Sequence, residues 1–315
     1  MDTLIYWFAR ALVAGIQALP LRFVARLGRR GGGLVYWLDA RHRRVALQNL
    51  TMCLGNEKSP AEIRAIAREN FRRIGENFGS AVKTAAMSFE ALRPHVEFVG
   101  VERLPARTAE QPPPNVVVAI GHFGNFELYA RFGQFRPEYQ CATTYRALKH
   151  AAFDRLLQQL RERSGCLFFE RRTDGPLLRA AMHRPSLGSS GPAGQQGVIL
   201  GFLTDQSTAG LRGPFLGHDC STTLAPAVFA LRYHCELYTG ICYRVALAKW
   251  RLELGKKIPT HESGQPRSSE EIMRDVNRAF EIAVRRDPAN WFWVHRRWKA
   301  AEPKTKMEVR KWKLP

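Results

Sequence analysis

The strongest constraint on the fold of this chain is a short apolar stretch followed directly by a glycine and a histidine, with a glutamate five residues after the histidine. Residues 115–120 (N-V-V-V-A-I) are apolar after the first residue and rich in valine, as is typical of a strand buried on both faces of a sheet. The residues after Glu127, at 128–132, favour a helix. His122 is therefore predicted at the carboxyl end of a strand, the sheet edge where open α/β folds place their chemistry.

Other segments repeat this alternation of buried strands and helices. Residues 198–203 form a second apolar run, closed by Thr204-Asp205-Gln206, and residues 96–100 alternate as a strand does. Residues 225–232 favour a helix that backs the sheet, and residues 235–245 favour a further strand. The pattern predicts an α/β fold with a central, mostly parallel sheet flanked by helices.

The amino terminus combines an apolar segment with a basic flank. Residues 4–21 are largely apolar, and as a helix of 18 residues they would be about 27 Å long, slightly shorter than a bilayer core of roughly 30 Å. The positive charge follows the apolar run, which argues against a signal peptide. We expect membrane attachment, either by spanning with a cytoplasmic flank or by lying in the interface with arginines on lipid headgroups. The basic residues are Arg22, Arg26, Arg29, Arg30, Arg41, Arg43 and Arg44.

Two helices are predicted before the sheet. The first includes residues 43–50 and ends near Gly55, and the second begins at Ser59-Pro60-Ala61-Glu62, with Ser59 as its cap. We therefore divide the chain into a membrane-associated helix at residues 1–40, a helical arm at 41–95 and an α/β domain at 96–315.

Charge and cysteine content narrow the class of protein. A net charge of +20 attracts phosphate-bearing partners, whether nucleic acid, anionic membrane or acidic small substrates. A nucleic-acid-binding protein is a distant alternative, because no binding motif is recognisable and the amino terminus is apolar. The six cysteines lack C-x-x-C spacing and are typical of reduced core residues; His218-Asp219-Cys220 has no further ligand cluster, so no metal site is expected.

The residues around His122 form a candidate catalytic site. A single histidine at a strand end is more often an ordinary surface or core residue, but here His122 and Glu127 share one turn with Asn125. We expect the Glu127 carboxylate to bond one ring nitrogen of His122, which fixes the tautomer and leaves the other nitrogen as a base for a hydroxyl. Asn125 is a candidate donor to a developing oxyanion.

The motif H-F-G-N-F-E at 122–127 resembles the H-x4-D/E signature of glycerolipid-type acyltransferases, and in particular the late lipid A acyltransferases. Further segments are similar to that family in the expected order: Tyr145-Arg146, an Arg-x-Arg pair at Arg161, Asp205-Gln206, and W-x-H-R-R-W-K around Arg296. The insertion at 184–197 departs from the family, which joins these elements more tightly.

The resemblance implies what the chain does and which residues take part. It implies transfer of an acyl chain from acyl carrier protein, or acyl-CoA, to a hydroxyl of an anionic glycolipid such as a lipid A precursor, at the cytoplasmic face of the bacterial inner membrane. His122 and Glu127 would be catalytic, with no metal or other cofactor. The candidate substrate-binding residues are Asn125, Arg146, Arg161, Asp205, Gln206 and Arg296. Alternative acceptors are a phosphatidylinositol mannoside, a lysophospholipid or an amino lipid.

Overall fold

The computed structural model describes residues 2–106, 113–183, 196–206 and 210–298. A seven-stranded sheet forms its centre, with strand order β1-β9-β8-β2-β5-β3-β4. Every neighbouring pair is parallel except β8 with β9, which is an antiparallel hairpin. The expected α/β class with a mostly parallel central sheet is confirmed. The strands are β1 (Val96–Val99), β2 (Val116–Ile120), β3 (Tyr139–Tyr145), β4 (Leu167–Glu170), β5 (Gly197–Leu203), β8 (Glu236–Ala246) and β9 (Lys249–Leu254).

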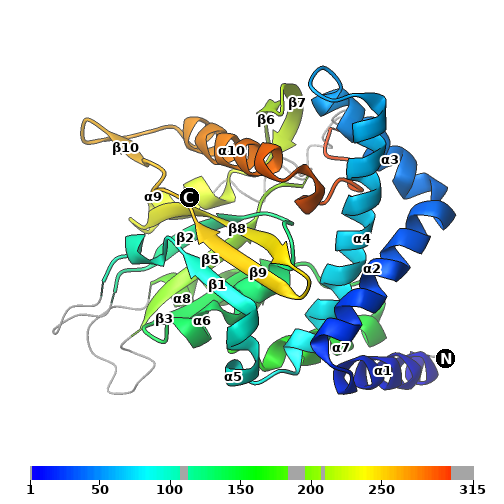
Figure 1. Ribbon diagram of the computed structural model, residues 1–315. Coiled ribbons are helices and arrows are strands. Elements are labelled where there is room, and N and C mark those ends of the chain that lie inside the picture. Colours follow the sequence, from blue (N-terminus) through cyan, green and yellow to red (C-terminus); the bar gives the residue numbers. More distant parts are fainter. Residues whose placement is uncertain (1, 107–112, 184–195, 207–209, 299–315) are drawn as a thin grey trace.

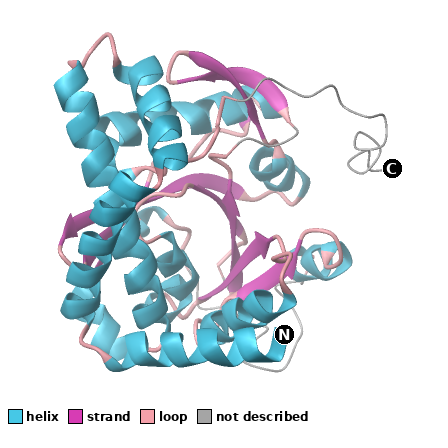
Figure 2. Ribbon diagram, turned by 90° about the vertical axis from the view of Figure 1, so that its right-hand side faces the viewer, coloured by secondary structure: helices cyan, strands magenta, loops and turns pink. Residues whose placement is uncertain are grey.

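Helices enclose the sheet, and Figures 1 and 2 show them on both of its sides. The helices are α1 (Asp2–Ala18), α2 (Leu21–Leu38), α3 (Ala40–Leu54), α4 (Pro60–Ala85), α5 (Phe89–Leu92), α6 (Phe132–Phe135), α7 (Ala151–Glu162), α8 (Gly175–Met182), α9 (Ala225–Arg232) and α10 (Ser269–Arg286). Short 3-10 helices lie at Arg93–His95, Val101–Arg103, Phe126–Arg131 and Pro288–Asn290. Two small hairpins complete the described part: β6 (Leu211–Phe215) with β7 (His218–Thr222), and β10 (His261–Glu262) with β11 (Gln265–Pro266).

The central strand β2 is buried on both faces, as its composition predicts. Val117 and Ala119 pack in one hydrophobic cluster with side chains of α8, α9 and α10. Val118 and Ile120 point to the other face, into a separate cluster that includes Leu104. Since neighbouring residues of a strand face opposite ways, a run of valines suits a sheet covered on both sides.

The amino-terminal helices form a layer beside the sheet, in which α2, α3 and α4 pack together and α1 lies against α7 (Figure 1). The predicted cap of α4 is confirmed, because Ser59 and Glu62 exchange side-chain-to-backbone hydrogen bonds as a capping box. The apolar run predicted at 4–21 is divided at Pro20 between α1 and α2. No helix of the described residues is both long enough and apolar enough to cross a membrane.

Glycines bring the backbones of α2 and α4 into contact. A Cβ atom added at Gly32 would lie 2.1 Å from the carbonyl oxygen of Phe71, and one added at Gly28 would lie 2.4 Å from that of Gly75. Because a carbonyl oxygen can move only if its helix moves, both positions require glycine. At Gly31, one residue before Gly32, a Cβ atom would meet nothing within 4 Å.

Alanine at these two adjacent glycines is expected to change stability in opposite directions. Gly32→Ala should lower the free energy of unfolding by about 1–3 kcal/mol, the usual cost of overpacking. Gly31→Ala should raise it by about 0.5–1 kcal/mol, because alanine loses less conformational entropy in a helix. Denaturant titration of both variants beside the unsubstituted protein measures the two shifts. Shifts of the same sign would show that the close α2–α4 approach does not govern stability.

Candidate active site

The loop after β2 places His122 at the carboxyl edge of the sheet, as the sequence predicts. Gly121 has no room for a side chain, since a Cβ atom there would lie 2.6 Å from the ring of Phe123. Gly124 has φ +52°, a conformation that favours glycine, and a Cβ atom there would lie 2.5 Å from the carbonyl oxygen of Cys242. The two glycines of the motif therefore make the sharp turn that presents the His122 ring.

Asp205 is the carboxylate that holds His122. Its strand, β5, is hydrogen-bonded directly to β2, so the residues after the two strands meet at one edge. One oxygen of Asp205, Oδ1, lies 2.7 Å from His122 Nδ1. The other, Oδ2, accepts hydrogen bonds of 2.7 Å from the backbone N–H of His122 and from the indole N–H of Trp291. Asp205 is 1% exposed, so these donors replace its water.

The charge on Asp205 determines which ring nitrogen of His122 can act as a base. Burial raises the pKa of Asp205, but the His122 ring, its backbone N–H and Trp291 outweigh this effect and hold the pKa below its usual value. Asp205 is therefore ionised at neutral pH and can only accept hydrogen bonds, so Nδ1 of neutral His122 carries the proton. The lone pair is then on Nε2, which makes no hydrogen bond to any residue that the structure describes.

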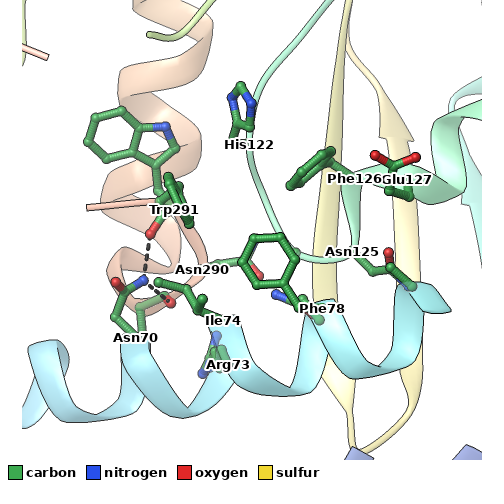
Figure 3. A pocket seen from close by; sticks show the side chains of 15 residues that line it. Asn70, Arg73, Ile74, Phe78, His122, Asn125, Phe126, Glu127, Asn290 and Trp291 are labelled. Carbon is green, nitrogen blue, oxygen red and sulfur yellow. Dashed lines mark hydrogen bonds between the residues drawn. The ribbon is translucent and has the colours of Figure 1, made fainter. Parts of the chain in front are cut away.

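Glu127 does not make the contact with His122 that the sequence predicts. Its two carboxylate oxygens accept forked hydrogen bonds of 3.1 and 2.7 Å from Arg161 Nε and Nη2. The ring of Phe126 packs edge-on against the His122 ring, with centroids 4.8 Å apart, and lies between His122 and Glu127 in the view of Figure 3. The expected Glu127–His122 bond is thus replaced by Asp205–His122, because a 3-10 helix begins at Phe126 and Glu127 is paired with Arg161.

The carboxyl-terminal segment completes the support of the site, a role that sequence patterns did not reveal. Trp291 donates to Asp205, and its own carbonyl accepts from the Asn70 side chain of α4, as does that of Ala289 (Figure 3). The Asn49 side chain of α3 donates to the carbonyls of Trp293 and His295. One signal for this role was present in the sequence: Asn49 and Asn70 lie within otherwise apolar helix faces, and a buried amide requires hydrogen-bond partners.

Arg297, also in the carboxyl-terminal motif, holds the loop after β5, which carries Asp205. Its buried guanidinium donates to the carbonyl oxygens of Gln206 and Ser221, at 2.6 and 2.7 Å, and to the hydroxyl of Thr222. Burial lowers its pKa, and the nearby Asp205 carboxylate partly opposes this. In the H-R-R-W-K motif, Arg297 therefore has a structural role: it stabilises the loop after β5.

A large cavity opens beside His122. Its volume is about 1470 Å³, larger than the 300–1,000 Å³ typical of small-molecule sites. Apolar side chains from one face of the sheet, such as Val118, Ile120 and Ile199, line part of it, and charged side chains line another part. A cavity of this size, lined mainly by apolar side chains and in part by charged ones, fits an amphipathic substrate.

The remaining candidate residues are distributed unequally around this cavity. Arg146, Arg161 and Gln206 line it together with His122 and Glu127. Asn125 does not line this cavity but a second, small pocket of about 20 Å³, which His122 and Glu127 also line (Figure 3). Asn125 is 1% exposed and has no hydrogen-bond partner for its amide among the described residues. Arg296 is exposed and is not among the residues that line the cavity. The insertion lies mostly outside the described residues.

Comparison with known proteins agrees with the motifs. Residues 1–300 match the family model described as bacterial lipid A biosynthesis acyltransferase. A curated relative, the lipid A biosynthesis myristoyltransferase of Escherichia coli strain K12, is 35% identical over 100 residues. That stretch covers 30% of this chain and 29% of the relative. Since the family match spans nearly the whole chain, this protein belongs to the bacterial lipid A biosynthesis acyltransferase family.

Proposed function

We propose that the protein transfers a fatty acyl chain from a thioester to a hydroxyl group of a lipid A precursor. The observation that carries this proposal is the His122–Asp205 pair, whose histidine lines a cavity large enough for an amphipathic lipid. Family membership supports the reaction class, because the matched model is named for lipid A biosynthesis acyltransferases.

His122 is the catalytic base of the proposed reaction. Nε2 takes the proton of the acceptor hydroxyl while its oxygen attacks the thioester carbonyl carbon, forming the new C–O bond. The tetrahedral intermediate then collapses, the C–S bond breaks, and the imidazolium returns the proton to the departing thiolate. Asp205 is a positioning residue that keeps Nδ1 protonated and stabilises the imidazolium.

Glu127 and Arg161 are proposed to act as a pair. Glu127 holds the guanidinium of Arg161 at the cavity wall, where it also lies 4.8 Å from the Phe168 ring. A guanidinium fixed in this way can donate to a substrate oxygen with little loss of side-chain entropy. Glu127 is then a second positioning residue, and its effect on turnover is transmitted through Arg161.

We propose acyl carrier protein as the donor, with acyl-CoA as the alternative. The acceptor could also be a phosphatidylinositol mannoside, a lysophospholipid or an amino lipid. The deciding experiment incubates purified protein with each donor and with a lipid A precursor or each alternative acceptor, and identifies products by mass spectrometry. One added acyl chain on the lipid A precursor is the expected product. Acylation of another lipid alone, or of none, would overturn the proposal.

We further propose that α1 and α2 attach the protein to the cytoplasmic face of the bacterial inner membrane. Tyr6 of α1 faces the protein and donates to Gln159 of α7, while the opposite face of α1 carries large apolar side chains that are 59–78% exposed. Those residues are Leu4, Trp7, Phe8 and Leu12. Their i, i+3, i+4 and i+8 spacing makes one continuous stripe.

Helix α2 adds an apolar stripe and a basic stripe side by side. Phe23, Leu27, Leu34 and Leu38 are exposed along one line of the helix. Arg22, Arg26 and Arg30 are exposed on the adjacent line, and none of them pairs with a carboxylate among the described residues. Apolar side chains that enter the acyl boundary beside arginines that meet phosphates are the arrangement of an interfacial helix.

Charged substitutions on the outer face of α1 are expected to release the protein from membranes. Trp7→Glu combined with Phe8→Glu should reduce sedimentation with vesicles containing anionic lipid by about tenfold or more, because two large apolar groups leave the bilayer and two negative charges approach it. Ile282→Glu, at an exposed apolar position on α10, is the control. Equal sedimentation of both variants would exclude this face of α1.

A further inference from the structure

Strand β8 continues past the end of its neighbour β2, and part of its backbone there has no strand to pair with on that side. The parallel pairing of the two strands ends with Ile120 opposite Gly240, whereas β8 runs on to Ala246. The carbonyl of Cys242 and the N–H of Arg244 are two residues apart in β8, so both point to the same side of the strand. Because backbone groups inside a protein need hydrogen-bond partners, this stretch of β8 requires a substitute for the missing strand.

The side chain of Asn290 is that substitute. Its Nδ2 donates to the carbonyl of Cys242 at 2.9 Å, and its Oδ1 accepts from the N–H of Arg244 at 3.2 Å. A side-chain amide offers a donor and an acceptor, as a peptide unit does, so it satisfies both backbone groups at once. Asn290 is 3% exposed, and these two bonds are therefore made away from water.

The backbone of Asn290 holds the loop that carries His122. Its carbonyl accepts from the N–H of Gly124 at 3.1 Å, and Gly124 is the residue of this loop with φ +52°. The loop is thus held at two points, by Asp205 at the N–H of His122 and by Asn290 two residues later. Asn290 and His122 also line the same small pocket (Figure 3).

Asn290 is itself fixed by its own turn and by helix α4. It ends the 3-10 helix that begins at Pro288, and its N–H donates to the carbonyl of Asp287 at 3.0 Å. The side chain of Asp287 accepts a hydrogen bond of 2.6 Å from Arg73 of α4. The Asn70 side chain donates to the carbonyls of the residues before and after Asn290. Every polar atom of Asn290 therefore has a partner, and its partners lie on β8, on the catalytic loop and on its own turn.

We propose that Asn290 is a positioning residue for the catalytic base, an inference that rests on the proposed acyl transfer. The side chain joins Asn290 to the sheet at β8, and the carbonyl joins the Gly124 turn to Asn290. The sheet thereby fixes the loop in which Asp205 meets Nδ1 of His122 and Nε2 is left for the acceptor hydroxyl. Precise placement of such a group matters, because a misplacement of about 1 Å can cost about 10²-fold in rate.

Asn290→Ala removes both side-chain bonds to β8, and Asn115→Ala is the matched control. The Asn115 side chain makes the same two kinds of bond: it donates to the carbonyl of Met182 at 3.0 Å and accepts from the N–H of Val198 at 2.8 Å. It lies just before β2, at the opposite end of the strand from His122. Both substitutions should lower the midpoint of denaturant unfolding, so a loss of stability alone does not separate them.

Asn290→Ala is expected to lower kcat by about 10–100-fold with little change in KM for either substrate, because the base moves while the cavity stays intact. Asn115→Ala should leave both constants unchanged. Asn290→Asp keeps the side-chain volume and loses only the donor to Cys242, so it replaces Asn290→Ala if that variant does not fold. Its kcat should fall as well. A folded variant at Asn290 with the kcat of Asn115→Ala would overturn the positioning role.

A spectroscopic measurement reports the position of the base without turnover. In protein labelled with ¹⁵N in histidine, the ring resonances of His122 are those missing from His122→Ala. They should shift in Asn290→Ala or Asn290→Asp and stay in place in Asn115→Ala, because only the substitutions at Asn290 release the loop. This difference would stand even if the protein transferred no acyl chain. Unchanged His122 resonances in a folded variant at Asn290 would reject the positioning role even in an active acyltransferase.

Discussion

His122→Ala is expected to abolish acyl transfer while leaving the protein folded and membrane-bound. Loss of a general base typically costs about 10²–10⁴-fold in rate, because the acceptor hydroxyl is too weak a nucleophile without proton removal. The side chain is partly exposed and hydrogen-bonds only to Asp205 among the described residues, so its removal should have little effect on packing. Turnover of purified protein with an acyl thioester and the lipid acceptor measures the loss.

His261→Ala is the matched control for this substitution. His261 lies on the exposed β10–β11 hairpin, where its ring contacts only the neighbouring Thr260 hydroxyl among the described residues. Its replacement should leave kcat within about twofold of the unsubstituted value, since surface changes away from special features have small effects. Unchanged circular dichroism and vesicle binding of His122→Ala would show that its lost activity is chemical. Full activity of folded His122→Ala would remove His122 from the mechanism.

Asp205→Asn is expected to lower kcat by about 10²–10⁴-fold with a much smaller change in KM for either substrate. The neutral amide no longer stabilises the imidazolium, and it can hold the ring in the wrong tautomer, with the proton on Nε2. Where the ring instead keeps its proton on Nδ1, the amide leaves at least one of the three donors facing Asp205 without an acceptor, at a cost of about 1–3 kcal/mol in stability. Steady-state kinetics and denaturant unfolding measure the two effects separately.

Glu127→Gln is the comparison that tests which carboxylate serves the histidine. It keeps the shape of the Glu127 side chain and weakens only its ion pair with Arg161. We expect Glu127→Gln to reduce kcat less than Asp205→Asn does. We also expect its effect on kcat to be larger than its effect on acceptor binding. A larger loss for Glu127→Gln than for Asp205→Asn would restore the sequence-based interpretation, in which Glu127 supports the base directly.

Local pattern was sufficient to predict most of the elements around the site. The valine-rich run at β2 and the apolar run at β5 were identified because both faces of these strands are buried, which removes polar residues from the sequence itself. The position of His122 followed, since the residue pair after such a strand lies at the sheet edge. The segment after Glu127 was predicted as a helix, and it is a 3-10 helix followed by the one-turn helix α6.

The partners of the charged side chains could not be predicted in the same way. Asp205 was singled out as a site residue, yet its bond to His122 depends on β5 lying directly beside β2, a pairing across 83 residues of chain. Glu127 was assigned to His122 because five residues separate them, but Arg161, from α7, takes that carboxylate. Trp291 donates to Asp205 from a carboxyl-terminal segment whose backbone accepts a hydrogen bond from Asn70 of α4.

By itself, the sequence determined the α/β class, the sheet edge that carries His122, and the family to which the chain belongs. These features depend on side-chain period, turn residues and short motifs, all of which act over a few neighbouring residues. Only the tertiary structure decided that Asp205 holds the base, that Glu127 holds Arg161, and that Asn290 joins the His122 loop to β8. Hydrogen bonds and ion pairs form between groups that are close in space, and strand order brings those groups together from distant parts of the chain.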